Sequence, residues 1–362
     1  MNILCVIDSL GSGGAQRQLV GLAKGFKEKG HDVSFLVYHT ENFFKELLDK
    51  ANIPVIVIRE KNYLKRLFRM GKYIRKGKFD VVLSFLEAAN FICELAGLPW
   101  KRWKLIVGER SANPQILISF KLRFYRWFHL LADYVVANSH ENLKMVAKIN
   151  PLLPLDKCKV ISNMVDTEHW VPSSEYTPLM GGKLKILIAG THLQNKNLNG
   201  LIEAVYGLNS DEKQKLIIEW YGNSGFDDSL KKAKLLITKY SLEDIFIFYP
   251  ATLDLPLKMQ QADFIGLFSF YEGLPNVVCE GMATGKPIIA SRISDVPMLL
   301  SQNNGFLCDP NDFKSITKAL RHALNLNKTD LKKMGEASRN YAITLFSQDI
   351  ILRKYENLMD FK

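Results

Sequence analysis

The chain has 362 residues and is 47% hydrophobic, which suits two domains with substantial cores better than one. No stretch reaches the roughly 18 unbroken apolar residues of a membrane span, and residues 2–7 are strand-like with no basic region before them, so we expect no signal peptide. The five cysteines are scattered, and neither Asp-x-Asp nor a histidine cluster occurs. The sequence therefore predicts a reducing cytoplasm, no disulfide framework and no metal site.

Charge is distributed unevenly along the chain. Residues 1–165 hold 26 Lys and Arg against 14 Asp and Glu, a net charge of +12, whereas the remaining residues hold 22 against 23. The basic half is expected to meet an anionic partner. Nucleic acid is not expected, because no DNA- or RNA-binding motif is present.

Short apolar runs typical of buried strands alternate with helical patterns. In the first half the runs are 2–7, 32–37, 55–58, 81–85, 105–107 and 134–137. A second series follows the Pro- and Ser-bearing stretch 171–182, at 184–189, 216–221, 245–249, 264–268 and 287–290. Helical patterns such as 16–29 and 198–208 lie between them. The alternation predicts parallel sheets covered by helices, arranged as two Rossmann-like domains.

The glycine-rich segment 11–14 follows the first expected strand. Glycines let the backbone approach a ligand closely, and a following helix start favours an anion. The segment is not G-x-G-x-x-G, so a tight turn without a ligand is an equally good interpretation.

The most informative segment is 271–280, Y-E-G-L-P-N-V-V-C-E. Glu272 lies on a Gly-Leu-Pro turn, and Glu280 lies about one turn inside the helix that this turn opens, with Pro275 suited to the first helical position. Backbone N–H groups at a helix start suit phosphate. Glu280 could accept hydrogen bonds from a ribose diol, and Glu272 could hold hydroxyls beyond the phosphates. This layout fits a nucleotide diphosphate that carries a sugar.

The same segment resembles the E-x7-E signature of the GT4-type (group 1) retaining glycosyltransferases, through E-G-L-P-N-V-V-x-E-x-M-A-x-G-K-P. The resemblance implies the α/β GT-B fold, in which two Rossmann-like domains with parallel sheets face each other across a cleft. It implies an N-terminal acceptor domain at 1–165, joined by a C-terminal helix at about 347–362. The C-terminal nucleotide-sugar donor domain would then span 166–346.

Other motifs extend the resemblance. Residues 13–17, G-G-A-Q-R, are similar to the family opening G-G-A-[EQ]-R, and Lys196-Asn197 matches the end of the family's phosphate loop. Thr191 stands where the family usually has Arg, so Lys196 would carry more of the diphosphate charge. His192 could substitute for that Arg or be an exposed loop histidine. Residues 160–167 resemble the family hinge I-P-N-G-V-D-T, with Met164 in place of Gly.

The family resemblance also implies roles for individual residues of the site. The resemblance implies catalytic roles for Glu272 and Lys196. It implies donor binding by Gly190, Thr191, Lys196, Asn197, Gly273, Leu274, Asn276, Val277 and Glu280. Cleft or acceptor-side roles are expected for Gly13, Gly14, Glu109, Arg110 and Asn163, although Asn163 could equally form only an Asx turn. Glu87 also follows an expected strand. We expect no metal or other cofactor, and no side chain stands out as a general base.

Two basic-aromatic segments, 63–76 and 120–131, lie in the basic half. In the first, Leu64, Leu67, Phe68 and Ile74 could share one helix face. Such helices suit an anionic membrane surface. Ordinary α/β helices that bury one face in the core would have the same sequence pattern.

The expected activity is a retaining hexosyl or N-acetylhexosaminyl transfer. The donor would be a nucleotide-diphosphate sugar, most plausibly a UDP-sugar. The acceptor would be a polyprenyl-diphosphate-linked or other glycan, in surface polysaccharide or O-antigen assembly. Such an enzyme would be cytoplasmic and peripheral at the inner face of the cell membrane. A GT-B sugar-nucleotide epimerase and a non-catalytic nucleotide-sugar- or lipid-binding module are the alternatives.

Overall fold

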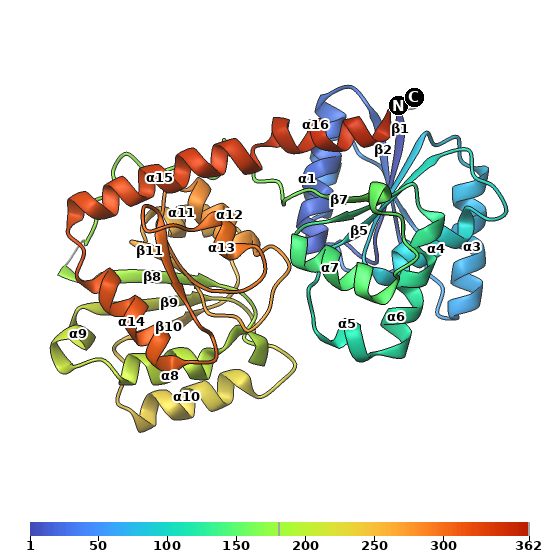
Figure 1. Cartoon of the computed structure of the whole chain (residues 1–362). Coiled ribbons are helices and arrows are strands. Elements are labelled where there is room, and N and C mark those ends of the chain that lie inside the picture. Colours follow the sequence, from blue (N-terminus) through green and yellow to red (C-terminus); the bar gives the residue numbers. More distant parts are fainter. Residues whose placement is uncertain (180–181, 361–362) are drawn as a thin grey trace. The chain divides into compact units, whose positions relative to one another are not determined.

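The structure is a computed structural model that describes residues 1–179 and 182–360. The chain divides into two compact units (Figure 1). The first unit is Met1–Met164 together with the C-terminal segment that starts at Gln348, and the second is Val165–Ser347. Each unit is a parallel sheet with helices on both faces. The predicted α/β class with two parallel-sheet domains is therefore confirmed.

The first unit is built on a seven-stranded parallel sheet of order β3-β2-β1-β4-β5-β6-β7. Its strands are β1 (Asn2–Val6), β2 (Asp32–Val37), β3 (Val55–Val57), β4 (Val81–Phe85), β5 (Lys104–Glu109), β6 (Tyr134–Ala137) and β7 (Cys158–Val160). Every residue of β4 is buried, as expected for a central strand covered on both faces.

Helices cover both faces of this sheet. One face carries α1 (Gly14–Glu28), α2 (Lys45–Lys50) and α16 (Gln348–Met359). The other carries α3 (Tyr63–Lys76), α4 (Glu87–Ala96) and α7 (His140–Ile149). The short α5 (Gln115–Ile118), α6 (Phe120–Trp127) and a 3-10 turn (Phe128–Leu131) pack beside α4 and α7.

The C-terminal helix α16 is part of the first unit. It packs on α1 so closely that a Cβ at Gly25 would lie 2.5 Å from Leu352. Lys29 Nζ lies 2.8 Å from a carboxylate oxygen of Glu356. The sequence places this helix at about 347–362; the structure begins it at Gln348, and residues 361–362 lie outside the described residues.

The second unit has a six-stranded parallel sheet of order β10-β9-β8-β11-β12-β13. Its strands are β8 (Leu184–Ala189), β9 (Leu216–Tyr221), β10 (Phe246–Tyr249), β11 (Phe264–Leu267), β12 (Ile288–Ser291) and β13 (Gly305–Cys308). One face carries α8 (Leu198–Tyr206), α10 (Ser229–Lys239) and α14 (Phe313–Leu324). The other carries α11 (Leu255–Gln260), α12 (Asn276–Ala283), α13 (Val296–Leu299) and α15 (Lys328–Phe346), while the short α9 (Ser210–Gln214) precedes β9.

Both sheets have a topological switch point, the place where strand order reverses. In the first unit β1 lies between β2 and β4, and in the second β8 lies between β9 and β11. In the first sheet the loops after β1 and β4 leave toward opposite faces, and in the second sheet the loops after β8 and β11 do the same. This divergence opens a crevice at the carboxyl ends of each pair of strands. Ligands of open α/β sheets bind in this crevice.

Candidate active site

The loop after β8 is fixed by hydrogen bonds at both ends. Trp220 Nε1 donates to the carbonyl oxygen of Gly190 at 2.8 Å. At the other end Asn197 has φ 60°, and its side chain accepts from Gly200 N at 3.2 Å and donates to the carbonyl oxygen of Pro310 at 2.8 Å. Asn197 thus caps α8 and sets the direction in which Lys196 leaves the loop.

Lys196 and Glu272 meet at the switch point of the second unit. Lys196 follows β8 and Glu272 follows β11, and the two form an ion pair through Nζ and Oε1. Ser269 Oγ donates to the same carboxylate oxygen at 2.9 Å, and Phe270 N donates to the carbonyl oxygen of Asn195 at 2.8 Å. The side chains of the pair are 22% and 19% exposed, so a ligand can reach both.

Helix α12 begins beside this pair. Gly273 and Leu274 are buried in the turn, and α12 starts at Asn276 and Val277. Pro275 is the residue before the helix, one position earlier than the sequence predicts. Glu280 lies in the second turn and is 4% exposed. The predicted donor residues of the second unit therefore gather around one helix start and one ion pair.

His192 differs from both sequence interpretations. It is buried, its Nδ1 donates to the carbonyl oxygen of Asn223 at 2.9 Å, and its ring lies against Trp220 and Phe248. Burial lowers its pKa, so the ring is neutral near pH 7. The exposed-loop interpretation is wrong, and a neutral imidazole supplies no cation in place of the Arg that Thr191 replaces.

Three of the predicted cleft residues lie at the start of α1 or after β7. Gly13 precedes α1 and Gly14 is its first residue, and both are exposed. Asn163 is 3% exposed. The next residue, Met164, is held through its backbone N–H and carbonyl by the side chain of Gln18 at 2.7 and 2.9 Å. These bonds fix the segment at which the first unit ends.

Glu109 and Arg110 lie at the end of β5, as predicted, but both are engaged inside the first unit. Glu109 is buried and accepts from Arg126 Nη2 at 2.7 Å and from His129 Nε2 at 3.0 Å. Arg110 stacks 3.9 Å from the centre of the Phe85 ring and donates to the hydroxyl of Tyr355. Their roles toward an acceptor stay predictions.

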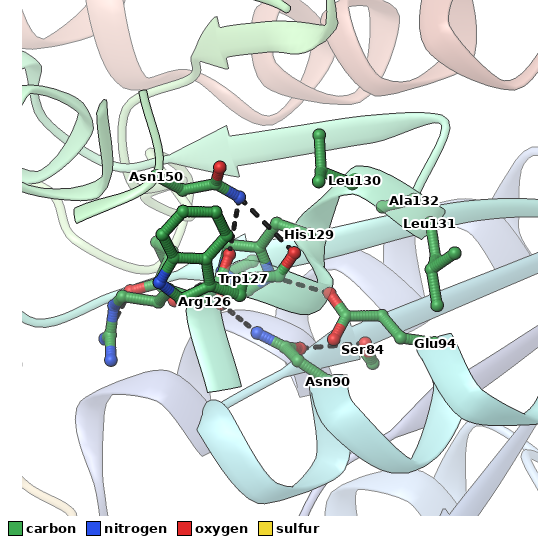
Figure 2. Close-up of polar contacts among 12 residues, drawn as sticks. Ser84, Asn90, Glu94, Arg126, Trp127, His129, Leu130, Leu131, Ala132 and Asn150 are labelled. Atoms are coloured by element: carbon green, nitrogen blue, oxygen red, sulfur yellow. Dashed lines mark hydrogen bonds and ion pairs between the residues drawn. The ribbon is translucent and has the colours of Figure 1, made fainter. Parts of the chain in front are cut away.

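Sequence reasoning missed the buried charge network around Arg126 and His129. His129 Nδ1 lies 2.6 Å from Glu94 Oε1, and Arg126 also contacts Glu87 at 3.3 Å. Figure 2 shows His129 turned toward Glu94, with the amide of Asn150 on the carbonyl oxygens of Arg126 and Trp127. A signal existed, because positions 126 and 129 share a helical face beside the acidic end of β5.

In this network the paired charges counteract the cost of their own burial. Burial opposes the charge on Glu109, but Arg126 and His129 lower its pKa to about 2. Burial also opposes the charge on His129, but Glu94 and Glu109 raise its pKa to about 9. His129 is therefore an imidazolium near neutral pH, with one ring nitrogen on Glu109 and the other on Glu94, whose pKa burial raises.

The basic-aromatic segments are partly exposed. On α3, Leu64 is 73% and Phe68 is 67% exposed, whereas Ile74 is fully buried, so the four apolar residues do not share one face as expected. In the second segment Trp127 is exposed but Arg126 points inward. Within residues 1–179 and 182–360, no helix is both long enough and apolar enough to span a membrane. The same residues contain no group of three His, Cys, Asp or Glu side chains placed to hold a metal ion.

Comparison with known families assigns the chain. The profile described as "Glycosyl transferases group 1" matches residues 175–341, and "Glycosyltransferase Family 4" matches residues 12–169. These two matches together cover most of both units. The chain belongs to the group 1, GT4-type glycosyltransferases, as the E-x7-E segment predicts.

Individual relatives agree with this assignment. An uncharacterized glycosyltransferase of Haemophilus influenzae is 25% identical over 356 residues, 96% of each chain. In Campylobacter jejuni, the GalNAc-alpha-(1->4)-GalNAc-alpha-(1->3)-diNAcBac-PP-undecaprenol alpha-1,4-N-acetyl-D-galactosaminyltransferase is 25% identical over 338 residues, 90% of this chain and 89% of that one. The crystal structure of Anabaena HepE in complex with UDP-glucose has a TM-score of 0.87 at 19% identity, over 99% of this chain and 98% of that one. The protein therefore has the GT-B fold.

Proposed function

We propose that this glycosyltransferase is a retaining, metal-independent enzyme that transfers a hexose or N-acetylhexosamine from a UDP-sugar to a lipid-linked saccharide in surface glycan assembly. The observation that carries the proposal is the meeting of Lys196 and Glu272 beside the start of α12. A cation, a carboxylate and a helix N-terminus at one switch point suit a diphosphate and the sugar attached to it.

When the donor binds, Lys196 and Glu272 would each exchange the other for a group of the donor. A diphosphate at the start of α12 offers Lys196 more negative charge than one carboxylate does. Lys196 would then turn to the phosphates, and Glu272 would be released to accept hydrogen bonds from hydroxyls of the donor sugar. Glu280, one turn further along α12, would accept from the ribose diol. No step requires a metal, because Lys196 and the helix N-terminus carry the phosphate charge.

Retention of configuration would follow a front-face course. The donor phosphate leaves on the same side from which the acceptor hydroxyl attacks, and a phosphate oxygen takes the acceptor proton. Lys196 would stabilise the charge that develops on the departing UDP. This course needs no side-chain nucleophile, in keeping with the absence of an obvious one from the sequence.

The acceptor proposal comes from relatives and from charge. The Campylobacter relative is named for an undecaprenol-diphosphate-linked saccharide. The net charge of +12 on residues 1–165 suits an anionic lipid surface. A sugar acceptor presented there would place the enzyme at the inner face of the cell membrane.

A test starts from UDP-sugars and a bacterial lipid extract that contains polyprenyl-diphosphate-linked saccharides. The proposal expects UDP release that depends on the extract, with the anomeric configuration of the donor kept in the lipid product. Sugar isomerisation without UDP release would favour the epimerase. UDP binding without either reaction would favour the non-catalytic module, and an inverted product would refute retention.

We propose that membrane contact is made by exposed residues of the first unit, the basic-aromatic surface. Its exposed residues are Leu64, Lys65, Phe68, Arg69, Lys72, Ile118, Phe120, Lys121, Arg123, Phe124 and Trp127. Phe120 and Phe124 stack with their ring centres 6.4 Å apart. Arg66 does not belong to this surface, because its guanidinium lies 4.4 Å from the ring centre of Tyr38.

Liposome sedimentation tests the membrane proposal. Each basic residue near an anionic surface contributes about 1 kcal/mol, so reversing Lys65, Arg69 and Lys72 to Glu should abolish sedimentation with anionic vesicles at low salt. Reversal of the exposed Lys231, Lys232 and Lys234 of α10 is the matched control and should leave sedimentation unchanged. Equal indifference of the parent protein to anionic and neutral vesicles would refute membrane contact.

A further inference from the structure

Glu87 occupies the place in the first unit that Glu272 occupies in the second. Each is the first carboxylate after the strand that lies across the switch point, β4 in one sheet and β11 in the other. Each also pairs with a cation, Arg126 for Glu87 and Lys196 for Glu272. The crevice at such a point is where open α/β sheets bind ligands.

Among the residues that the structure describes, Glu87 is the one member of the buried charge network that solvent reaches appreciably. Its side chain is 29% exposed, whereas those of Arg126, Glu109, His129 and Glu94 are at most 3% exposed. Only one of its oxygens has a hydrogen-bond partner among the described residues, Arg126 Nη2 at 3.3 Å. The other oxygen can accept from a ligand.

Arg126 is held rigidly. Its Nη1 donates to the carbonyl oxygen of Leu122 at 2.9 Å, and its Nη2 donates to Glu109 at 2.7 Å. Glu109 is held in turn by His129, and His129 by Glu94. Burying these charges costs desolvation energy, and the attraction between the paired charges rarely outweighs that cost. A gain in stability is therefore a poor explanation for the buried charge network. Its effect is to fix the carboxylate of Glu87.

Tyr38 supplies an independent second group at this edge. It follows β2, its backbone N–H donates to the carbonyl oxygen of Asp8 at 3.1 Å, and the residue is 6% exposed. Its hydroxyl has no hydrogen-bond partner among the described residues. β2 and β4 both pair with β1 in parallel, so Tyr38 and Glu87, which follow them, leave the same edge of the sheet. Burial, and after it the negative charge of Asp8, raise the pKa of Tyr38, so its phenol keeps its proton.

We infer that Glu87 and Tyr38 form a subsite for hydroxyl groups of the acceptor sugar, with Arg126 as the positioning residue for Glu87. A carboxylate accepts and a phenol donates or accepts, which matches vicinal hydroxyls of a glycan. Charged phosphates would be repelled by Glu87, so the ligand is the saccharide part of the acceptor. This inference rests on the proposed transferase function.

The test titrates the lipid extract as acceptor at saturating UDP-sugar. Glu87→Gln should raise the apparent acceptor KM about tenfold or more, and Tyr38→Phe about threefold. UDP affinity, measured by calorimetry, and acceptor-independent UDP release should keep their parental values. Glu46→Gln is the matched control, since Glu46 also lies in the first turn of a helix of this unit but pairs with the exposed Lys50 at 2.8 Å.

Positioning by Arg126 has its own readout. Arg126→Lys should raise the acceptor KM in the parent, but hardly further in the Glu87→Gln variant, because the two residues act through one contact. Parental acceptor KM values for both Glu87→Gln and Tyr38→Phe would overturn the subsite while leaving the transferase intact. A parent protein that binds UDP but transfers no sugar would overturn the proposed function, and this inference with it.

Discussion

At the end of β11 the carboxylate of Glu272 meets a lysine that is 22% exposed, whereas at the end of β4 the carboxylate of Glu87 meets an arginine that is 1% exposed. Both pairs lie at a switch point, and they differ in what surrounds the cation. Lys196 has Glu272 as its ion-pair partner and a flexible stem, so a phosphate can replace the carboxylate. Arg126 is 1% exposed and is held by Glu109 and a backbone carbonyl, so it cannot turn to a ligand as Lys196 can.

Under the proposed function, this difference between the two pairs would suit the two substrates. A diphosphate donor brings charge and must be released again as UDP, which favours a pair that can open. A glycan acceptor brings neutral hydroxyls, which need a carboxylate already held in place. Under the proposed function, the same sheet position would therefore serve partner exchange in one unit and fixed positioning in the other.

The largest effect is expected from a substitution that breaks the ion pair of Lys196 and Glu272. Glu272→Gln should lower kcat on the order of 10²–10³-fold, because a contact made to the sugar in the transition state is lost. Free UDP should bind as in the parent or more tightly, since Lys196 no longer has a competing carboxylate. Steady-state kinetics and calorimetry with UDP measure the two quantities. Weaker UDP binding with an unchanged kcat would instead mean that Glu272 serves donor binding alone.

The buried network should give the first unit a distinctive pH dependence. The pKa of His129 is raised from 6.5 to about 9, so its contribution to stability is complete below pH 6.5 and is lost as the pH rises through 9. His129→Gln should therefore cost about 3 kcal/mol of unfolding free energy at pH 6, and the cost should shrink by pH 9. Urea unfolding at both pH values measures this.

Lys286 in the second unit provides the contrasting case. Burial lowers its pKa from 10.5 to about 7, against the attraction of Asp263. The folded state loses its proton first, so stability rises as the pH rises from 7 to 10.5. Lys286→Met should stabilise the protein more at pH 7 than at pH 10. Parallel pH profiles for His129→Gln and Lys286→Met would contradict the assignment of opposite linkages.

Much of this architecture could be predicted from the sequence. Buried parallel strands are nearly continuous apolar runs, so 81–85, 134–137, 184–189 and 216–221 coincide with observed strands. β7 and β13 were missed, because C-K-V is a three-residue strand with a lysine at its centre and G-F-L-C begins with a glycine. The contact between Lys196 and Glu272 follows from topology once both residues are assigned to strand ends. The Arg126 network does not, because its partners lie up to 39 residues apart in the chain and only packing reveals which face turns inward.

Lys196 tests the exchange of partners from the cation's side. Lys196→Ala should weaken UDP binding about 10- to 100-fold, because it removes a charge-assisted contact to the diphosphate and Thr191 supplies no charge. Thr191→Arg in that background should recover part of the affinity, since Thr191 is exposed on the same loop. Calorimetry measures both, with Lys234→Ala of α10 as the control. Parental UDP affinity for Lys196→Ala would remove this residue from the donor site.

The smallest expected effect concerns Glu280. The described part of the first unit has no residue that corresponds to it, because the network around Glu87 contains no second carboxylate that faces a ligand from a helix. Glu280 is 4% exposed in the second turn of α12, and we expect its carboxylate to accept hydrogen bonds from the ribose diol of the donor. Glu280→Gln keeps the shape and removes the charge, so UDP should bind about tenfold more weakly. The parent should discriminate between UDP and 2′,3′-dideoxy-UDP, and the variant should discriminate much less, because the missing hydroxyls and the missing charge belong to one contact. Calorimetry on the four combinations of protein and nucleotide measures this coupling. Equal discrimination by parent and variant would show that Glu280 supports the helix rather than the ribose, and the donor site would then depend on Lys196, Glu272 and the start of α12.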